Sequence, residues 1–91
     1  MLVAFVLIDA EPARVAALAT ELADVEGVAE VYSVAGECDL VAIVRVRHHD
    51  DLAEVVTGRI GALNGIVATR TMVAFKAYSA RDLDAMWDVG G

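Results

Sequence analysis

The chain has 91 residues and a formal net charge of −7, and hydrophobic residues make up 58% of it while aromatic residues make up 5%. This length predicts one domain with a small core. Seven dispersed basic residues are too few for the basic stripe typical of nucleic-acid-binding proteins. No apolar run reaches the roughly 18 residues that span a bilayer. We therefore expect no direct contact with nucleic acid and no membrane insertion.

Two further features bear on location and assembly. The opening run Met1–Ile8 is too short for a signal peptide and lacks a basic start, and the single cysteine, Cys38, excludes an internal disulfide. Both features favour a reducing, cytoplasmic location. The apolar fraction is also high for so small an interior, which predicts that some apolar surface faces a second protomer.

The first third of the chain predicts a strand and a helix. Met1–Ile8 is apolar at every position, so this strand should be buried on both faces. Pro12 fits the first turn of a helix, where its missing N–H is not needed, and Gly27 ends that helix. The helix carries one apolar stripe, formed by Val15, Leu18, Leu22 and Val25.

The stretch Val28–Val46 predicts a hairpin. Two runs rich in β-branched residues flank the polar break Gly36–Asp39, and the second strand should cover Asp39–Arg47. Gly36 permits backbone conformations that other residues avoid, and Asp39 places a carboxylate at the mouth of the second strand. The turn therefore concentrates features that a ligand site uses.

The last third predicts a helix, a strand and a tail. Asp51 and Glu54 have the spacing of a capping box, with Asp51 as the cap, and Asn64-Gly65 stops the helix. Ile66–Tyr78 is typical of a long strand. The tail, residues 79–91, is expected to form a short helix capped by Ser79, and the alternative is a frayed terminus. The apolar stripe of the second helix comprises Leu52, Val55, Val56, Ile60 and Leu63.

The order strand-helix-strand occurs twice. Right-handed crossovers then place both helices on one face of a four-stranded antiparallel sheet, which is the ferredoxin-like βαββαβ fold of the α+β class. We expect this domain to cover residues 1–78. Because the strands are apolar on both faces and two helices cover only one, we expect a homodimer that packs sheet against sheet.

At this point the sequence resembles a known family. The segment VYSVAGECDLVAIVRV resembles the effector-domain signature of the leucine-responsive/asparagine regulator (Lrp/AsnC) family, a Gly-x-x-Asp turn before an apolar strand. VATRTMVAFKAYS is similar to the family's last strand, with its Thr-x-Thr. The resemblance implies a stand-alone effector domain without the family's helix-turn-helix domain. It also implies homodimers that assemble into rings, often octamers, and an amino acid bound in clefts between dimers.

The resemblance and the chemistry of the side chains suggest a set of ligand-binding residues. Asp39 can pair with a ligand's ammonium group, and the amides of the turn can bind its carboxylate. The alternative is that Gly36 only makes a tight turn, that Asp39 caps it, that the threonines only fill a strand and that Tyr32 is an ordinary core aromatic. Cys38 is smaller than the aromatic residue common before the motif aspartate. The full set is Tyr32, Gly36, Glu37, Cys38, Asp39, Thr69 and Thr71.

These features predict a ligand-sensing and oligomerisation module that binds an amino acid or similar molecule, and that co-assembles with DNA-binding relatives. We expect no catalytic residue, no cofactor and no metal, because His48-His49 with Asp50-Asp51 offers no obvious third converging ligand. One alternative is a small ferredoxin-like dimeric enzyme of the monooxygenase or isomerase type, which needs an acid/base pair or nucleophile in a cavity. Another is the allosteric binding domain of an amino-acid-regulated enzyme.

Overall fold

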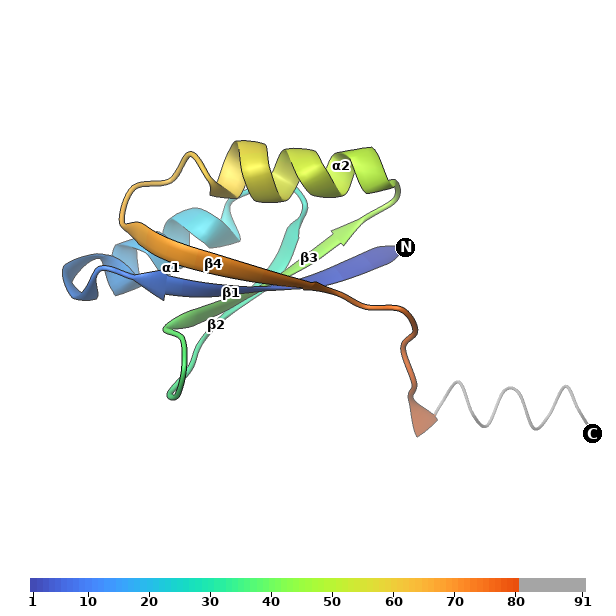
Figure 1. Cartoon of the computed structure of the whole chain (residues 1–91), viewed down its shortest axis with the longest axis horizontal. Coiled ribbons are helices and arrows are strands. Elements are labelled where there is room, and N and C mark those ends of the chain that lie inside the picture. The colour runs from blue at the N-terminus through green and yellow to red at the C-terminus, as the bar shows by residue number, and fades with distance from the viewer. Residues whose placement is uncertain (81–91) are drawn as a thin grey trace, which may run out of the picture.

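The computed structural model describes residues 1–80, so the predicted tail, residues 79–91, lies almost wholly outside the described residues. The strands form one antiparallel sheet in the order β2-β3-β1-β4. Their bounds are β1 Leu2–Ala10, β2 Val28–Ser33, β3 Leu40–Val46 and β4 Ile66–Val73. Both helices lie on the same side of this sheet (Figure 1), which confirms the ferredoxin-like fold.

Neither helix is α-helical over its whole length: the first begins with a 3₁₀ turn and the second ends in a π-helical segment. A short 3₁₀ turn, η1 (Pro12–Arg14), leads into α1 (Val15–Ala23), and Pro12 occupies the first turn as expected. The second helix starts as α2 (His49–Ala53) and continues without a break into the wider π-helical segment η2 (Glu54–Ile60). Together α2 and η2 make one long helix above the sheet.

The core lies between the sheet and the helices. Alternate residues of the two central strands point toward the helices and have no solvent exposure, namely Ala4, Val6, Ile8, Leu40, Ala42 and Val44. The predicted stripes of both helices meet them, with Leu18 and Leu22 buried from α1 and Leu52, Val55 and Ile60 buried from the second helix. Each fully buried aliphatic side chain stabilises the fold by about 1.5–3 kcal/mol.

The opposite side of the sheet is also largely apolar. Strand register places Phe5 of β1 between Ile43 of β3 and Met72 of β4. We call this side the open face; its residues include Val3, Phe5, Leu7, Val41, Ile43, Met72 and Tyr32. Phe5 is 36% exposed and Met72 is 55% exposed, so the residues described here do not bury this side as the helices bury the other.

Several predicted boundaries are wrong. The first helix ends at Ala23 rather than at Gly27, and the second ends at Ile60 rather than at Asn64-Gly65. β4 ends at Val73 rather than Tyr78, and the last residue pair of its ladder with β1 is Ala4 with Val73. The second helix begins at His49, so Asp51 lies in its first turn and is not its cap. The acidic side chains Asp50 and Asp51 instead suit the positive end of the helix dipole.

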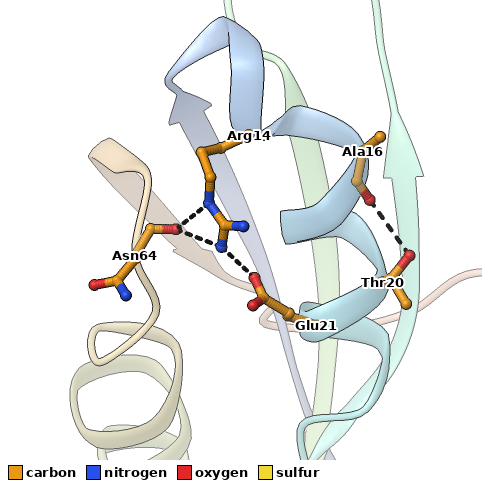
Figure 2. Close-up of polar contacts among 5 residues, drawn as sticks. All are labelled: Arg14, Ala16, Thr20, Glu21 and Asn64. Atoms are coloured by element: carbon orange, nitrogen blue, oxygen red, sulfur yellow. Dashed lines mark hydrogen bonds and ion pairs between the residues drawn. The ribbon is translucent and has the colours of Figure 1, made fainter.

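An arginine joins the helix layer to the loop that enters β4. The Arg14 guanidinium donates to the Asn64 carbonyl, at 3.4 Å from Nε and 3.2 Å from Nη2, and it also pairs with Glu21 (Figure 2). Gly65 lies directly beneath, where a Cβ atom would come within 2.8 Å of the Arg14 Cβ, and its φ is +96°. Nearby, the Thr20 hydroxyl donates to the Ala16 carbonyl (Figure 2). The loop that enters β4 is therefore tied to η1 and, through Glu21, to α1.

Candidate functional site

The loop between β2 and β3 is closed by hydrogen bonds that converge on Asp39. The Val34 N–H donates to the Asp39 carbonyl at 3.0 Å, and the Asp39 N–H donates to the Ile8 carbonyl at 3.0 Å. The Asp39 carboxylate Oδ2 accepts from the Ala10 N–H at 2.8 Å. The backbone and the side chain of one residue thus tie the turn to the end of β1.

The Asp39 carboxylate is needed because the ladder between β1 and β3 stops before Ala10. The pairing of β1 with β3 stops at Ile8 and Leu40, and the register of β1 with β4 shifts between Asp9 and Ala10. The Ala10 N–H therefore has no strand partner on the β3 side, although Ala10 is buried. Because an unsatisfied buried amide costs about 1–3 kcal/mol, an acceptor at position 39 stabilises the fold.

The other residues of the turn differ in exposure. Gly36 has a φ of +132°, and a Cβ atom built on it would meet nothing within 4 Å. Its requirement for glycine is therefore one of backbone conformation, and the space beside it is open to a ligand. Glu37 is exposed, whereas the Cys38 side chain is buried and stands away from the exposed surface of the turn.

The predicted threonines lie elsewhere on the sheet. Thr69 pairs with Ile8 and Thr71 with Val6, so both belong to the side that carries the helices, yet both are exposed because they lie on the edge strand β4. Ile8 in turn pairs with Leu40, which places β1 between Thr69 and the start of β3. With strands about 4.8 Å apart, the threonines stand about 10 Å from that strand.

Tyr32 lies on the open face, within a polar cluster. Its hydroxyl donates to the Glu30 carboxylate, and Arg45 Nη1 donates to the other oxygen of that carboxylate at 3.0 Å. The hydrogen bond from Tyr32, and then the one from Arg45, lower the pKa of Glu30, while Glu30 raises the pKa of Tyr32. The sequence reasoning missed Glu30 and Arg45. The available signal was that Glu30 and Tyr32 are two residues apart on a strand and therefore share a face.

This cluster borders a groove of about 530 Å³ at one end of the open face. Its floor is formed by Val3, Phe5 and Ile43, and one wall by Glu30, Tyr32 and Arg45. The opposite wall is the chain just after β4, Ala74–Ala77. Of the seven residues proposed from the sequence, Tyr32 lines this groove. The Gly36–Asp39 turn lies at the end of the sheet, and Thr69 and Thr71 lie on the side of the sheet that carries the helices.

The remaining chemistry of the described chain is limited. Among residues 1–80, no cluster of three or more His, Cys, Asp or Glu side chains could hold a metal ion. Within that same stretch, none of the helices combines the length and the apolar character needed to cross a membrane.

The architecture defines a class of protein. A four-stranded βαββαβ sheet with helices on one side and an apolar side left open is a ferredoxin-like domain. The model of the Lrp/AsnC ligand binding domain matches residues 3–83. The chain therefore belongs to the Lrp/AsnC ligand-binding domain family, as the resemblance predicted.

Individual relatives agree with this assignment. The HTH-type transcriptional regulator FL11 of Pyrococcus abyssi is 30% identical over 77 residues, which is 85% of this chain and 50% of that protein. The chain spans about half the length, or less, of the curated relatives that it matches. These relatives are HTH-type transcriptional regulators.

Solved structures show the same fold. TTHA0845 from Thermus thermophilus superposes with a TM-score of 0.82 at 48% identity, and the match covers 87% of this chain and 99% of that chain. A feast or famine regulatory protein from M. tuberculosis, solved in complex with L-methionine, has a TM-score of 0.72 at 32% identity, covering 89% of this chain and 55% of that chain.

Proposed function

We propose that this protein is a ligand-sensing and oligomerisation module that binds an amino acid or similar small molecule at a subunit interface, and that modulates DNA-binding relatives by assembling with them. The observation that carries the proposal is its 32% identity to a regulator complexed with L-methionine, across 89% of the chain. A cytoplasmic location accords with such a role.

The position of the candidate residues favours an interface over an internal pocket. The turn, Tyr32 and the two threonines occupy three separate surfaces of one chain. A molecule the size of an amino acid cannot touch all three within one protomer. A second subunit that brings its own turn or threonines against the first would complete a site.

The turn supplies the chemistry that an amino acid requires. Open space around Gly36 leaves the backbone of the turn accessible to a ligand's carboxylate. The Asp39 carboxylate uses Oδ2 for Ala10, and an ionised carboxylate can accept further bonds through its other oxygen, including one from an ammonium group. The exposed hydroxyls of Thr69 and Thr71 can donate or accept at the ligand's polar ends.

Regulation then follows from assembly. We propose homodimers that associate further, with an octamer as one outcome, and mixed assemblies with longer HTH-type relatives. A ligand changes the assembly only by as much as its affinity differs between the assembled and separated states. With a net charge of −7, the domain itself is poorly suited to bind DNA, so DNA contact would come from the relative.

The direct test is a calorimetric titration with each of the common amino acids, with L-methionine first, alongside the native mass of the particle. We expect one or a few to bind and to shift the mass. Thr69→Val or Thr71→Val should weaken binding about fivefold, corresponding to about 1 kcal/mol for a lost hydrogen bond. Thr20→Val is the matched control, because Thr20 lies on α1 and bonds to Ala16.

A negative result is equally clear. If every amino acid fails to bind while the protein unfolds cooperatively on heating, the sensing half of the proposal is wrong and only the assembly role remains.

A further inference from the structure

Asn64 carries the only side-chain amide of the chain, since the sequence has no other asparagine and no glutamine. Glycine follows it at position 65. The side-chain carbon of an asparagine can be attacked by the backbone nitrogen of the next residue, and a side chain on that next residue hinders the approach. Because glycine has no side chain, an Asn-Gly pair is the least hindered form of this arrangement.

Both reacting groups are unengaged in the folded chain. Asn64 is exposed, and its side-chain amide points away from the Arg14 guanidinium (Figure 2). Among residues 1–80, no hydrogen bond holds that side-chain amide, and the Gly65 N–H donates none either. Gly65 lies in the turn before β4 with a φ of +96°. The fold therefore leaves the electrophile and the nucleophile free to meet.

The Arg14 guanidinium is placed to assist the nucleophile. It donates to the Asn64 carbonyl, at 3.2 Å from Nη2 and 3.4 Å from Nε. This carbonyl and the Gly65 nitrogen belong to one peptide group, so negative charge formed on the nitrogen by loss of its proton is shared with the carbonyl oxygen through resonance. A cation that donates to this oxygen stabilises the deprotonated peptide group, as donors of an oxyanion hole stabilise an oxyanion.

We propose that Asn64 is a site of spontaneous modification, at which the Gly65 nitrogen displaces the side-chain nitrogen of Asn64. The Gly65 nitrogen loses its proton to water and forms a bond to Asn64 Cγ. The bond between Cγ and Nδ2 breaks, and the leaving nitrogen takes up a proton and departs as ammonia. One water molecule then opens the resulting cyclic imide at either carbonyl, which gives aspartate or isoaspartate at position 64. The inference is independent of ligand binding.

The modification acts on the end of the sheet that Asp39 holds. The Gly65 carbonyl accepts from the Glu11 N–H at 2.8 Å, and the preceding N–H, that of Ala10, donates to the Asp39 carboxylate at 2.8 Å. Isoaspartate adds one backbone atom before Gly65 and displaces its carbonyl from Glu11, whereas aspartate keeps the backbone unchanged. Isoaspartate therefore weakens the tie between β1 and the start of β4, and aspartate only adds a negative charge.

The first test is intact-mass spectrometry of the full chain incubated at neutral and at alkaline pH. A gain of one mass unit reports on Asn64 alone, because the chain has no other side-chain amide. The native chain should react faster at alkaline pH and within about tenfold of its rate in urea, whereas a reaction that required global unfolding would be slower by about a thousandfold or more. Asn64→Gln is the matched control and should keep its mass, because its ring would need one more atom. A native chain that keeps its mass while the chain in urea gains it would overturn the proposal.

The second test removes the guanidinium. Arg14→Met keeps an unbranched side chain beside Gly65 and should slow the native reaction about fivefold, with no change in urea. Arg59→Met is the matched control, because the Arg59 guanidinium also donates to a backbone carbonyl, that of Glu26 at 2.8 Å, and also pairs with a glutamate. An equal or faster native rate in Arg14→Met would overturn the role given to Arg14.

The third test compares the two products. Asn64→Asp supplies the aspartate form directly and should unfold at the same temperature as the parent chain. The isoaspartate form, separated from an aged sample by ion exchange and identified by peptide mapping, should unfold at a lower temperature. Equal unfolding temperatures for the two forms would overturn the effect on the tie between β1 and β4. None of these measurements uses an amino-acid ligand, so their failure and that of the sensing function are distinguishable.

Discussion

The two sides of the sheet use the same kinds of residue to different ends. On the helix side, Val6 and Ile8 are fully buried by α1 and the second helix of their own chain. On the open face, Phe5 alternates with them along β1 but keeps more than a third of its surface in water. Adjacent residues of one strand therefore belong to two different interfaces, one within the chain and one available to another molecule.

This difference separates folding from assembly. The helix side is completed within residues 1–80, and among those residues no polar or charged side chain is buried there. The open face instead carries ion pairs at its margins, Glu30 with Arg45 at 3.0 Å and Asp9 with Arg70 at 3.3 Å. An apolar centre with a charged margin is the pattern of a protein interface rather than of a core.

The largest effect should come from a pair of neighbours on β1. Ile8→Ala removes a fully buried side chain from the helix side and should lower the free energy of unfolding by about 2–5 kcal/mol at any protein concentration. Leu7→Ala removes a side chain of equal size from the open face. Its effect should be smaller and should grow with concentration, because it acts through association.

Chemical denaturation at several protein concentrations measures the free energy of unfolding of both variants. Equal, concentration-independent losses for Ile8→Ala and Leu7→Ala would show that the open face is completed within one chain, and the distinction between the two sides would fail.

A second prediction concerns the turn at the end of the sheet. Asp39→Ala leaves the Ala10 N–H without its acceptor and should cost about 1–3 kcal/mol of stability. Asp39→Asn keeps a carbonyl oxygen in the same place and should cost less, while it removes the charge that would bind a ligand's ammonium group. Thermal unfolding and amino-acid titration of both variants separate the two roles. If both variants unfold like the parent, the bond to Ala10 contributes nothing.

The sequence predicted the features that depend on periodicity. The apolar stripe Val15, Leu18, Leu22 and Val25 and the apolar run of β1 each follow from spacing along one element. Both contribute to the core, although Val25 lies beyond the end of α1 at Ala23. The Gly36–Asp39 turn was located for the same reason, since β-branched runs bracket it.

Features that join distant parts of the chain were not predictable in this way. Asp39 bonds to Ala10, 29 residues earlier, and only the shortened ladder between β1 and β3 explains that bond. β4 ends at Val73, where its ladder with β1 stops at Ala4, and the spacing of residues along β4 does not mark that point. The separation of Thr69 from the turn likewise follows from strand order, which places β1 between them.

The smallest predicted effect is a pH dependence confined to the open face. Tyr32 first, and then Arg45, lower the pKa of Glu30 below its usual 4.5. A lowered carboxyl pKa contributes stability that is present above pH 4.5 and is lost as the pH falls through the folded-state value. Tyr32→Phe removes the larger cause, so the Glu30 pKa should move back toward 4.5, and NMR titration of the Glu30 carboxyl carbon measures it. Tyr78→Phe is the matched control, because the Tyr78 ring lies beside Lys76. An equal Glu30 pKa in the parent and in Tyr32→Phe would show that the hydrogen bond between Tyr32 and Glu30 does not form in solution. Since the cluster is exposed, the loss of stability caused by Tyr32→Phe should fall well below the loss caused by Asp39→Ala.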